Sequence, residues 1–280
     1  MNNTKIEWAD MTWNPVTGCL HGCPYCYARR IANRFESRKG HELCTGDGAT
    51  SPICFPQIEN GICDMKYPLF FTKDCGASKT AMAPFPNGFT PTLHRYRLNE
   101  PEQEKNPKNI FTVSMGDLFG DWVPEDWIRE VFAACDRAPQ HRYLFLTKNP
   151  ARYQNFFGHD GDPERRNFWL GTSVSGDADC FRAYDLMDFH SYGGKFLSIE
   201  PLLSELHDVK RFLERGSTYH RWVDWAIIGA ETGNRKDKVI PKREWIEKIV
   251  EACHEIDVPV FMKGSLAKVW GAPLIQEFPW

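Results

Sequence analysis

The stretch Tyr-Leu-Phe-Leu-Thr-Lys at residues 143–148 sets the pattern from which the fold can be predicted. It is a short apolar run that ends in two polar residues, which is typical of a buried β-strand followed by a loop. Amphipathic helical segments separate it from similar runs, which recur at intervals of roughly 25 to 35 residues. This alternation predicts successive βα units and a parallel sheet. The other predicted strands are Ile110–Met115, Phe168–Val174, Lys195–Glu200, Trp222–Gly229 and Val258–Lys263.

Two of the intervening helices have a clear apolar face. Pro124 occupies the expected first position of the first helix, and the spacing from Trp127 to Cys135 places its apolar residues on one side. Pro241 opens the second, whose apolar side runs from Trp245 to Cys253. We therefore expect Cys135 and Cys253 to be core residues.

Polar residues gather where each predicted strand ends. In a parallel barrel these ends share one face, where the βα loops build the active site. A single polar residue after a strand carries little weight because loops are polar, but here the pattern repeats six times. The sequence predicts an α/β fold, a full or partial parallel βα (TIM-like) barrel, as one domain over residues 1–280. The six strand ends are Ser114–Asp117, Thr147–Lys148, Thr172–Ser175, Glu200–Pro201, Gly229–Gly233 and Lys263–Gly264.

Residues 40–90 interrupt this pattern and predict an irregular insertion after the first helix. They hold six Gly, five Pro and four Cys, and no periodic helix. The four cysteines suit a second Fe–S cluster or a zinc site, although no C-x2-C pair is present and ordinary unpaired thiols are the alternative. They are Cys44, Cys54, Cys63 and Cys75.

Composition narrows the class of protein. The chain has 280 residues, of which 42% are hydrophobic and 14% aromatic, with a net charge of −3. No apolar run approaches the roughly 20 residues that a membrane span needs, and the N-terminus lacks a secretory signal, so we expect a cytoplasmic protein with no membrane partner. Ten cysteines are many for a reducing compartment, which indicates metal ligation or catalysis for some of them.

Three cysteines lie together between a predicted strand and a predicted helix. Cys19, Cys23 and Cys26 follow the spacing C-x3-C-x2-C in a loop that contains Gly and Pro. Such a loop can wrap an iron–sulfur cluster, and three local thiolates would leave one iron open to a ligand. A structural zinc site completed by His21 or a distant residue, and dithiol chemistry at the last two cysteines, are the alternatives.

This spacing, with Tyr25 just before the last cysteine, resembles the signature of the radical-SAM superfamily. The resemblance implies a [4Fe–4S] cluster whose open iron binds S-adenosylmethionine (SAM). It also implies reductive cleavage of SAM to a 5′-deoxyadenosyl radical, an electron donor such as a flavodoxin or ferredoxin, and a βα barrel. Tyr25 would then lie among the cofactor-binding residues.

The chain as a whole also resembles a phage-associated family of unknown function. The resemblance extends nearly from end to end and rests on several short motifs. These are Trp-Asn-Pro-Val-Thr-Gly-Cys at 13–19, Leu93-His94, residues 114–119, residues 146–148, Glu-Pro-Leu-Leu at 200–203 and residues 229–233.

The radical-SAM resemblance suggests where SAM would bind. Ser114–Asp117 occupies the place of the superfamily's Gly-Gly-Glu segment, which is itself absent here. Asp117 could pair with the SAM ammonium, and Ser173 or Glu200 could bond the ribose hydroxyls. The remaining candidates are Gly229 and Ala230 for the adenine, and Lys148 and Lys263 for an anionic substrate or for ion pairs with Glu200 or Glu231.

These features lead to two hypotheses. The first is a radical-SAM enzyme that acts on an anionic substrate, with a nucleotide or nucleic acid as the class to test. The second is a non-catalytic nucleic-acid-binding protein in which a metal braces the cysteine loop.

Overall fold

The computed structural model describes residues 1–35, 42–45, 58–72, 81–158, 160–215 and 220–280. The fold is mixed α/β, and its largest sheet has eight strands in the order β1-β2-β10-β11-β12-β13-β16-β17. The chain divides into two compact units. The first comprises residues 1–3, 11–107 and 111–141, and the second comprises residues 4–10, 108–110 and 142–280.

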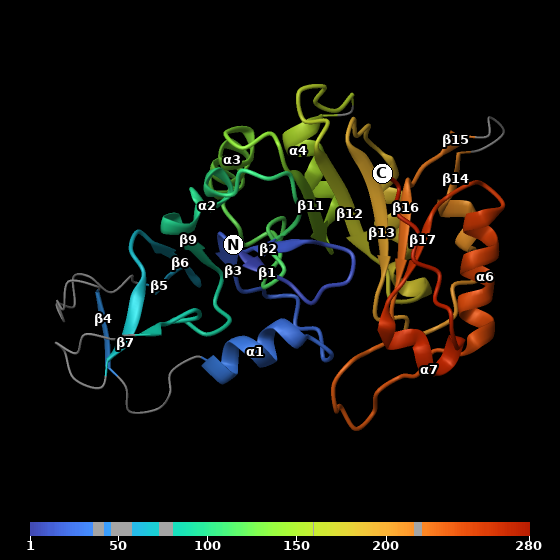
Figure 1. Ribbon diagram of the computed structural model, residues 1–280, viewed down its shortest axis with the longest axis horizontal. Helices are drawn as coiled ribbons and strands as arrows, with labels where there is room; N and C mark the ends of the chain where they lie inside the picture. Colours follow the sequence, from blue (N-terminus) through green and yellow to red (C-terminus); the bar gives the residue numbers. More distant parts are fainter. Residues whose placement is uncertain (36–41, 46–57, 73–80, 159, 216–219) are drawn as a thin grey trace. The chain divides into compact units, whose positions relative to one another are not determined.

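The second unit contains five parallel strands, all at positions predicted from the sequence (Figure 1). β12 and β13 are buried at every residue, because helices and loops cover both faces of the sheet. The near-continuous apolar runs are explained by this double burial. The strands are β11 (Arg142–Thr147), β12 (Phe168–Ser173), β13 (Gly194–Ile199), β16 (Trp225–Ile228) and β17 (Val260–Met262).

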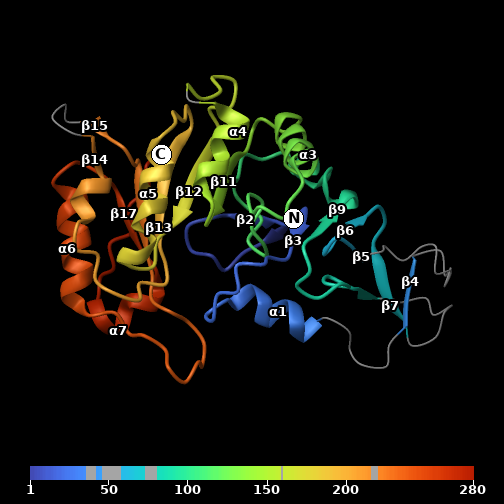
Figure 2. The same ribbon diagram turned by 180° about the vertical axis from the view of Figure 1, so that it is seen from behind.

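Helices follow these strands in the manner of βα units. α5 packs against β12, and Figure 2, the reverse of the view in Figure 1, shows this helix in front of the sheet. α6 packs against β17. Cys253 in α6 is fully buried, which confirms its predicted core position. The helices and minor elements are η3 (Pro150–Tyr153), α4 (Gln154–Phe157), η4 (Asp177–Asp179), α5 (Cys180–Met187), η5 (Val209–Phe212), β14 (Glu214–Arg215), β15 (His220–Arg221), α6 (Arg243–His254), η7 (Gly264–Leu266) and α7 (Ala267–Trp270).

The C-terminal segment covers the edge of β17. The N–H of Met262 donates to the carbonyl of Ile275, and the N–H of Glu277 donates to the carbonyl of Val260. Trp225 donates its indole N–H to the carbonyl of Glu277 at 2.9 Å. An edge strand with its backbone groups paired in this way no longer presents an open ladder to other chains.

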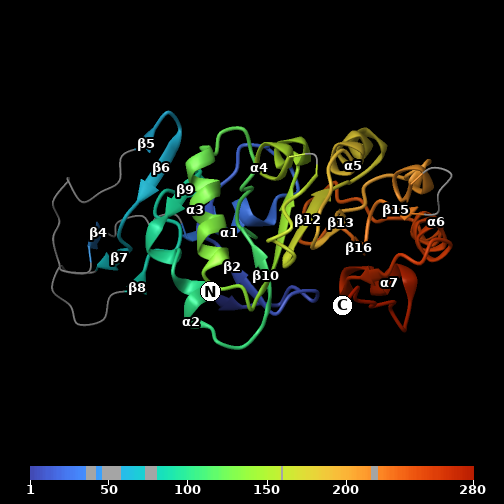
Figure 3. The same ribbon diagram turned by 90° about the horizontal axis from the view of Figure 1, so that it is seen from above.

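The first unit consists of short strands and a few helices. β6 pairs in parallel with β9 and antiparallel with β5, and the three strands lie side by side in Figure 3. Strands this short carry no alternating pattern, so the sequence indicated only an irregular insertion between residues 40 and 90. The strands are β1 (Asn2–Asn3), β2 (Met11–Trp13), β3 (Val16–Thr17), β4 (Glu42–Thr45), β5 (Ile58–Glu59), β6 (Ile62–Met65), β7 (Leu69–Thr72), β8 (Ala81–Met82) and β9 (Thr92–His94). β10 (Asn109–Thr112) has its first two residues in the second unit and its last two in the first.

The helical elements of the first unit are α1 (Tyr27–Phe35), η2 (Arg95–Arg97), α2 (Glu100–Gln103) and α3 (Glu125–Asp136). In α3, Pro124 is the N-cap residue and two acidic residues occupy the first turn, where they favour the positive end of the helix dipole. Trp127, Ile128, Val131, Phe132 and Cys135 are buried, which confirms the predicted apolar face.

β10 ends earlier than predicted. It stops at Thr112 because Val113 adopts a left-handed backbone conformation, with φ +64°. That conformation is rare for a β-branched residue and costs about 1–3 kcal/mol. The sharp turn carries the chain directly into Ser114–Asp117.

Closure of the sheet into a full or partial barrel, as one domain over residues 1–280, stays a prediction. Among the residues that the structure describes, no helix combines the length and apolar character that a membrane crossing requires.

Candidate functional site

The cysteine loop connects β3 to α1 in the first unit. Gly18 begins the loop with φ +87°, and a Cβ atom there would lie 2.4 Å from the backbone carbon of Thr90. Only glycine fits this close approach of two backbones. The N–H of Gly18 donates to the carbonyl of Met115 at 2.9 Å, so the start of the loop is fixed against the turn that follows β10.

The three thiols of the loop are half-buried. Burial raises the pKa of the Cys19 thiol to about 12; the backbone N–H of His21 acts in the opposite direction, and negative charge on Asp117 adds to the rise. Charge on Cys23 and Cys26 raises the same pKa. An uncompensated thiolate is therefore disfavoured at Cys19, whereas a bound metal cation would supply the missing positive charge.

The chemistry of these donors fits an iron–sulfur cluster. The backbone N–H of Arg29 points to the sulfur of Cys26 at 3.3 Å, and such N–H groups stabilise a thiolate. The chain thus supplies suitable donor atoms, but their positions are not those of an assembled site. In the described part of the chain, no three Cys, His, Asp or Glu side chains are placed to hold a metal ion.

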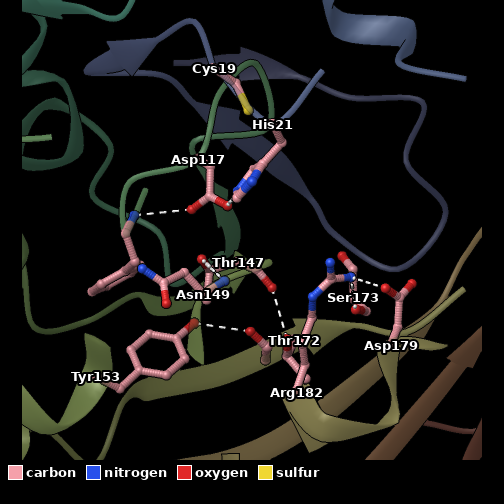
Figure 4. Close-up of polar contacts among 12 residues, drawn as sticks. Cys19, His21, Asp117, Thr147, Asn149, Tyr153, Thr172, Ser173, Asp179 and Arg182 are labelled. Atoms are coloured by element: carbon pink, nitrogen blue, oxygen red, sulfur yellow. Dashed lines mark hydrogen bonds and ion pairs between the residues drawn. The ribbon is translucent and has the colours of Figure 1, made fainter. Parts of the chain in front are cut away.

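His21 lies between the first two cysteines and forms a pair with Asp117 (Figure 4). The Nε2–H of His21 donates to Asp117 Oδ2 at 2.8 Å, and the imidazole also contacts the ring of Trp122 edge-on, with centroids 4.9 Å apart. The other oxygen of Asp117 accepts the N–H of Phe119 at 3.0 Å. Both oxygens of the carboxylate predicted to face SAM thus have partners within the protein.

Ser114 is bound by two residues that lie on either side of the cysteine loop and were not predicted as site residues. Asn14 Oδ1 accepts the Ser114 hydroxyl at 3.2 Å and the N–H of Met115 at 2.8 Å. Tyr27, at the start of α1, donates its hydroxyl to the carbonyl of Ser114 at 2.7 Å. Tyr25, the predicted cofactor neighbour, is half-buried in the cysteine loop.

An open pocket of about 290 Å³ borders Cys19 within the first unit. Arg29 and Phe89 line it, with the guanidinium 5.5 Å from the ring centroid, and Asn87 contributes a polar group. The pocket gives a small ligand access to the first cysteine.

The remaining predicted cofactor- and substrate-binding residues belong to the second unit, where Glu200 and Lys263 meet. Their side chains form an ion pair across the ends of β13 and β17. A Cβ atom at Gly229, which follows β16, would lie 3.0 Å from Cδ of Glu200 and 3.1 Å from Cδ of Lys263. The ion pair that the sequence left as an alternative for Lys263 is thus formed, and the glycine makes room for it.

Other polar groups of this unit have partners of their own. Arg235 binds Glu231 through two hydrogen bonds of 2.7 Å and holds the pKa of that carboxyl below its usual range. The N–H of Ala230 donates to the hydroxyl of Ser265 at 3.0 Å.

The ends of β11 and β12 are polar but mostly buried. Thr172 donates its hydroxyl to the carbonyl of Thr147 at 2.9 Å, and Arg182 donates to the carbonyl of Ser173 at 3.3 Å (Figure 4). Ser173 itself is buried, and Lys148 is half-buried. The predicted cofactor- and substrate-binding residues therefore fall into one group around the cysteine loop and another at the strand ends of the second unit.

The insertion cysteines can be followed only in part. Cys54 and Cys75 lie outside the described residues, and of Cys44 the structure describes only the backbone, in β4. Cys63, in β6, is buried and accepts a hydrogen bond from Asn87 Nδ2 at 3.1 Å; burial raises the pKa of its thiol to about 11.

Comparison with known proteins identifies one relationship. No curated protein and no solved structure matches the chain. A family model described as protein of unknown function (DUF5131) matches residues 3–272, almost the whole sequence. The chain therefore belongs to the DUF5131 family.

Proposed function

We propose that this protein binds a [4Fe–4S] cluster through Cys19, Cys23 and Cys26 and is a radical-SAM enzyme. The observation that carries the proposal is the group of three half-buried thiols on one loop, with a backbone N–H directed at the sulfur of Cys26. Three thiolates can hold three of the four irons and leave the fourth for a ligand.

The bound cluster would supply the electron that cleaves SAM to methionine and the 5′-deoxyadenosyl radical. The chain's own contribution is to fix the loop and limit access of water. Gly18 at the start of the loop, and Asn14 before β3, are hydrogen-bonded to the turn at Ser114–Met115, and partial burial shields the sulfurs from solvent.

The strand ends of the second unit are proposed to bind the rest of SAM and the substrate. Ser173 and Glu200 would face the ribose, and Gly229 and Ala230 the adenine. Lys148 and Lys263 would receive an anionic substrate, a nucleotide or nucleic acid by class, although such an anion must compete with Glu200 for Lys263. Closure of the sheet into a βα barrel belongs to the same proposal.

Anaerobic reconstitution with iron and sulfide tests the proposal. We expect a brown protein with about four irons per chain bound at the cysteine loop. This protein should form 5′-deoxyadenosine when SAM and dithionite are added. The electron donor in the cell would be a flavodoxin or ferredoxin. A reconstituted protein that holds iron but yields no 5′-deoxyadenosine would contradict the enzymatic half of the proposal.

The pairing of His21 with Asp117 favours a second function. Metal-ligating histidines commonly donate their other ring N–H to a carboxylate. A zinc ion held by the three cysteines and His21 would brace the loop of a non-catalytic nucleic-acid-binding protein. Purified protein with one zinc per chain, nucleic-acid affinity and no SAM cleavage would favour this alternative.

A further inference from the structure

Helix α1 presents an apolar stripe to solvent. Tyr27, Ile31 and Phe35 recur every four residues and therefore lie along one side of the helix. They are 42%, 37% and 39% exposed, respectively. The helix packs against the first unit through a different side, where Ala28 and Ala32 are buried. Large apolar side chains that share one exposed row, and are not scattered singly, are typical of an interaction surface.

The same helix is strongly basic. It contains Arg29, Arg30 and Arg34 and no acidic residue, although the whole chain has a net charge of −3. Arg30 and Arg34 are exposed, and the helical repeat places them opposite the buried alanines and next to the apolar stripe. A polyanion would therefore be attracted to this helix and not to the protein as a whole.

The pocket beside Cys19 lies on the other flank of α1. Arg29 and Asn33, one helical turn apart, line it together with Asn87 and Phe89. The guanidinium of Arg29 lies 5.5 Å from the centroid of the Phe89 ring and donates to the carbonyl of Cys19 at 3.4 Å. These contacts use only some of the five N–H donors of a guanidinium. Among the described residues, none that lines the pocket is acidic, so the pocket suits a phosphate and the polar edge of a base.

We propose that α1 and the adjoining pocket form a binding surface for single-stranded nucleic acid. Arg30 and Arg34 would contact the phosphates. Tyr27 and Phe35 would stack on bases, and the pocket at Arg29 would receive one nucleotide. The inference deepens the proposed function, on whose nucleic-acid class of substrate or partner it rests, and it requires no metal at the cysteine loop.

Two other polyanions fit this surface less well. The bases of a duplex are stacked on one another, so they would leave the exposed aromatic rings of α1 without a partner, whereas the bases of a single strand can stack on them. An anionic membrane would attract the arginines and take up the apolar stripe, but it would make no use of the two amides in the pocket.

Binding of a fluorescent oligothymidylate of about 15 nucleotides to the anaerobically purified protein tests the proposal, with anisotropy measured at several salt concentrations. Arg34→Gln should weaken binding and reduce the slope of log K against log salt concentration by about 0.7, because one phosphate contact is lost. Phe35→Ala should weaken binding at least about fivefold and leave the slope unchanged, because it removes stacking and no charge. Arg129→Gln and Phe181→Ala, at exposed positions of α3 and α5, are the matched controls and should bind as the wild-type protein does.

The outcomes separate this inference from the proposed function. Wild-type affinity and slope in both α1 variants would overturn the surface, as would tighter binding of a duplex or binding of phosphatidylserine vesicles alone. A protein that forms 5′-deoxyadenosine but binds no oligonucleotide overturns this inference and leaves the radical-SAM activity standing. A protein that binds the oligonucleotide through α1 and cleaves no SAM supports this inference and overturns that activity.

Discussion

At the scale of single residues, the three cysteines should be equally indispensable. A site with three thiolates cannot lose one and still hold its irons well. We expect alanine at Cys19, Cys23 or Cys26 to abolish cluster binding and SAM cleavage, as measured by iron content and by 5′-deoxyadenosine formation. Cys180, a half-buried thiol in α5, offers a matched control whose replacement should leave both unchanged. Full iron retention in all three loop variants would remove the cluster from this site.

A second residue-scale prediction concerns His94, which supports the strand before the cysteine loop. It is fully buried; its Nε2 lies 2.9 Å from the hydroxyl of Thr17 and its Nδ1 lies 3.1 Å from that of Tyr96. Burial first, and then the charge of Arg97, lowers the pKa of His94 well below its usual value of 6.5. Below about pH 6.5 the folded protein therefore binds fewer protons at His94 than the unfolded chain does. The stability that comes from a neutral His94 is fully present above about pH 6.5, and it is lost as the pH falls below that value.

Urea unfolding at about pH 7.5 and about pH 5.5 measures this effect. The free energy of unfolding of the wild-type protein should be lower at the acidic pH than at the higher one. In His94→Gln this decrease should be smaller. His207 is the control, because Asp177 raises its pKa and the side chain is exposed. If His94→Gln shows the same acid-induced loss as wild type, His94 is not its source.

At the scale of elements, Asn14 joins the segment between β2 and β3, just before the cysteine loop, to the turn after β10. Replacing Asn14 by alanine removes the side-chain oxygen that accepts the N–H of Met115 at 2.8 Å. Met115 is buried, so this N–H would be left without a hydrogen-bond partner away from water. The expected cost is about 1–3 kcal/mol in the free energy of unfolding. Asn33→Ala, at an exposed position of α1, should cost much less in the same urea titration. Equal costs would mean that Asn14 does not anchor the turn.

The elements themselves were largely predictable. β11, β12 and β13 lie within about one residue of the predicted runs, because a strand buried on both faces is largely apolar. β16 is shorter than its predicted run, 222–229, and begins only at Trp225. Apolar composition alone does not show where strand pairing begins.

Contacts between distant residues were not predictable in the same way. Asn14 and Met115 are 101 residues apart, and His21 and Asp117 are 96 apart. No periodicity links such positions, so the sequence marked Asp117 as a polar strand end but could not reveal its partner. The Trp-Asn-Pro-Val-Thr-Gly-Cys segment was noted as a motif, and the structure gives a physical reason for its Asn and Gly.

At the scale of the whole molecule, the total metal content should exceed one cluster. Cys44, Cys54, Cys63 and Cys75 lie in a Gly- and Pro-rich segment that has little apolar periodicity, and small irregular units commonly depend on a metal for stability. Burial raises the pKa of the Cys63 thiol to about 11, so the site that surrounds it also disfavours a bare thiolate. A metal cation would compensate that charge, and metal bonds can offset the entropy of closing the long loops between the cysteines.

Anaerobically prepared protein should therefore contain either more than four irons per chain or a separate zinc. The double variant Cys54→Ala, Cys63→Ala should lose this excess and keep the cluster of the first loop, since the two sets of cysteines are separate in the sequence. Cys135→Ala, Cys253→Ala is the matched control, because both thiols are buried in helices and neither is proposed as a ligand. Four irons and no zinc in the wild-type protein would make the insertion cysteines ordinary thiols. Loss of all metal in the double variant would instead mean that the two sites do not form independently, because the first loop then needs the insertion to hold its cluster.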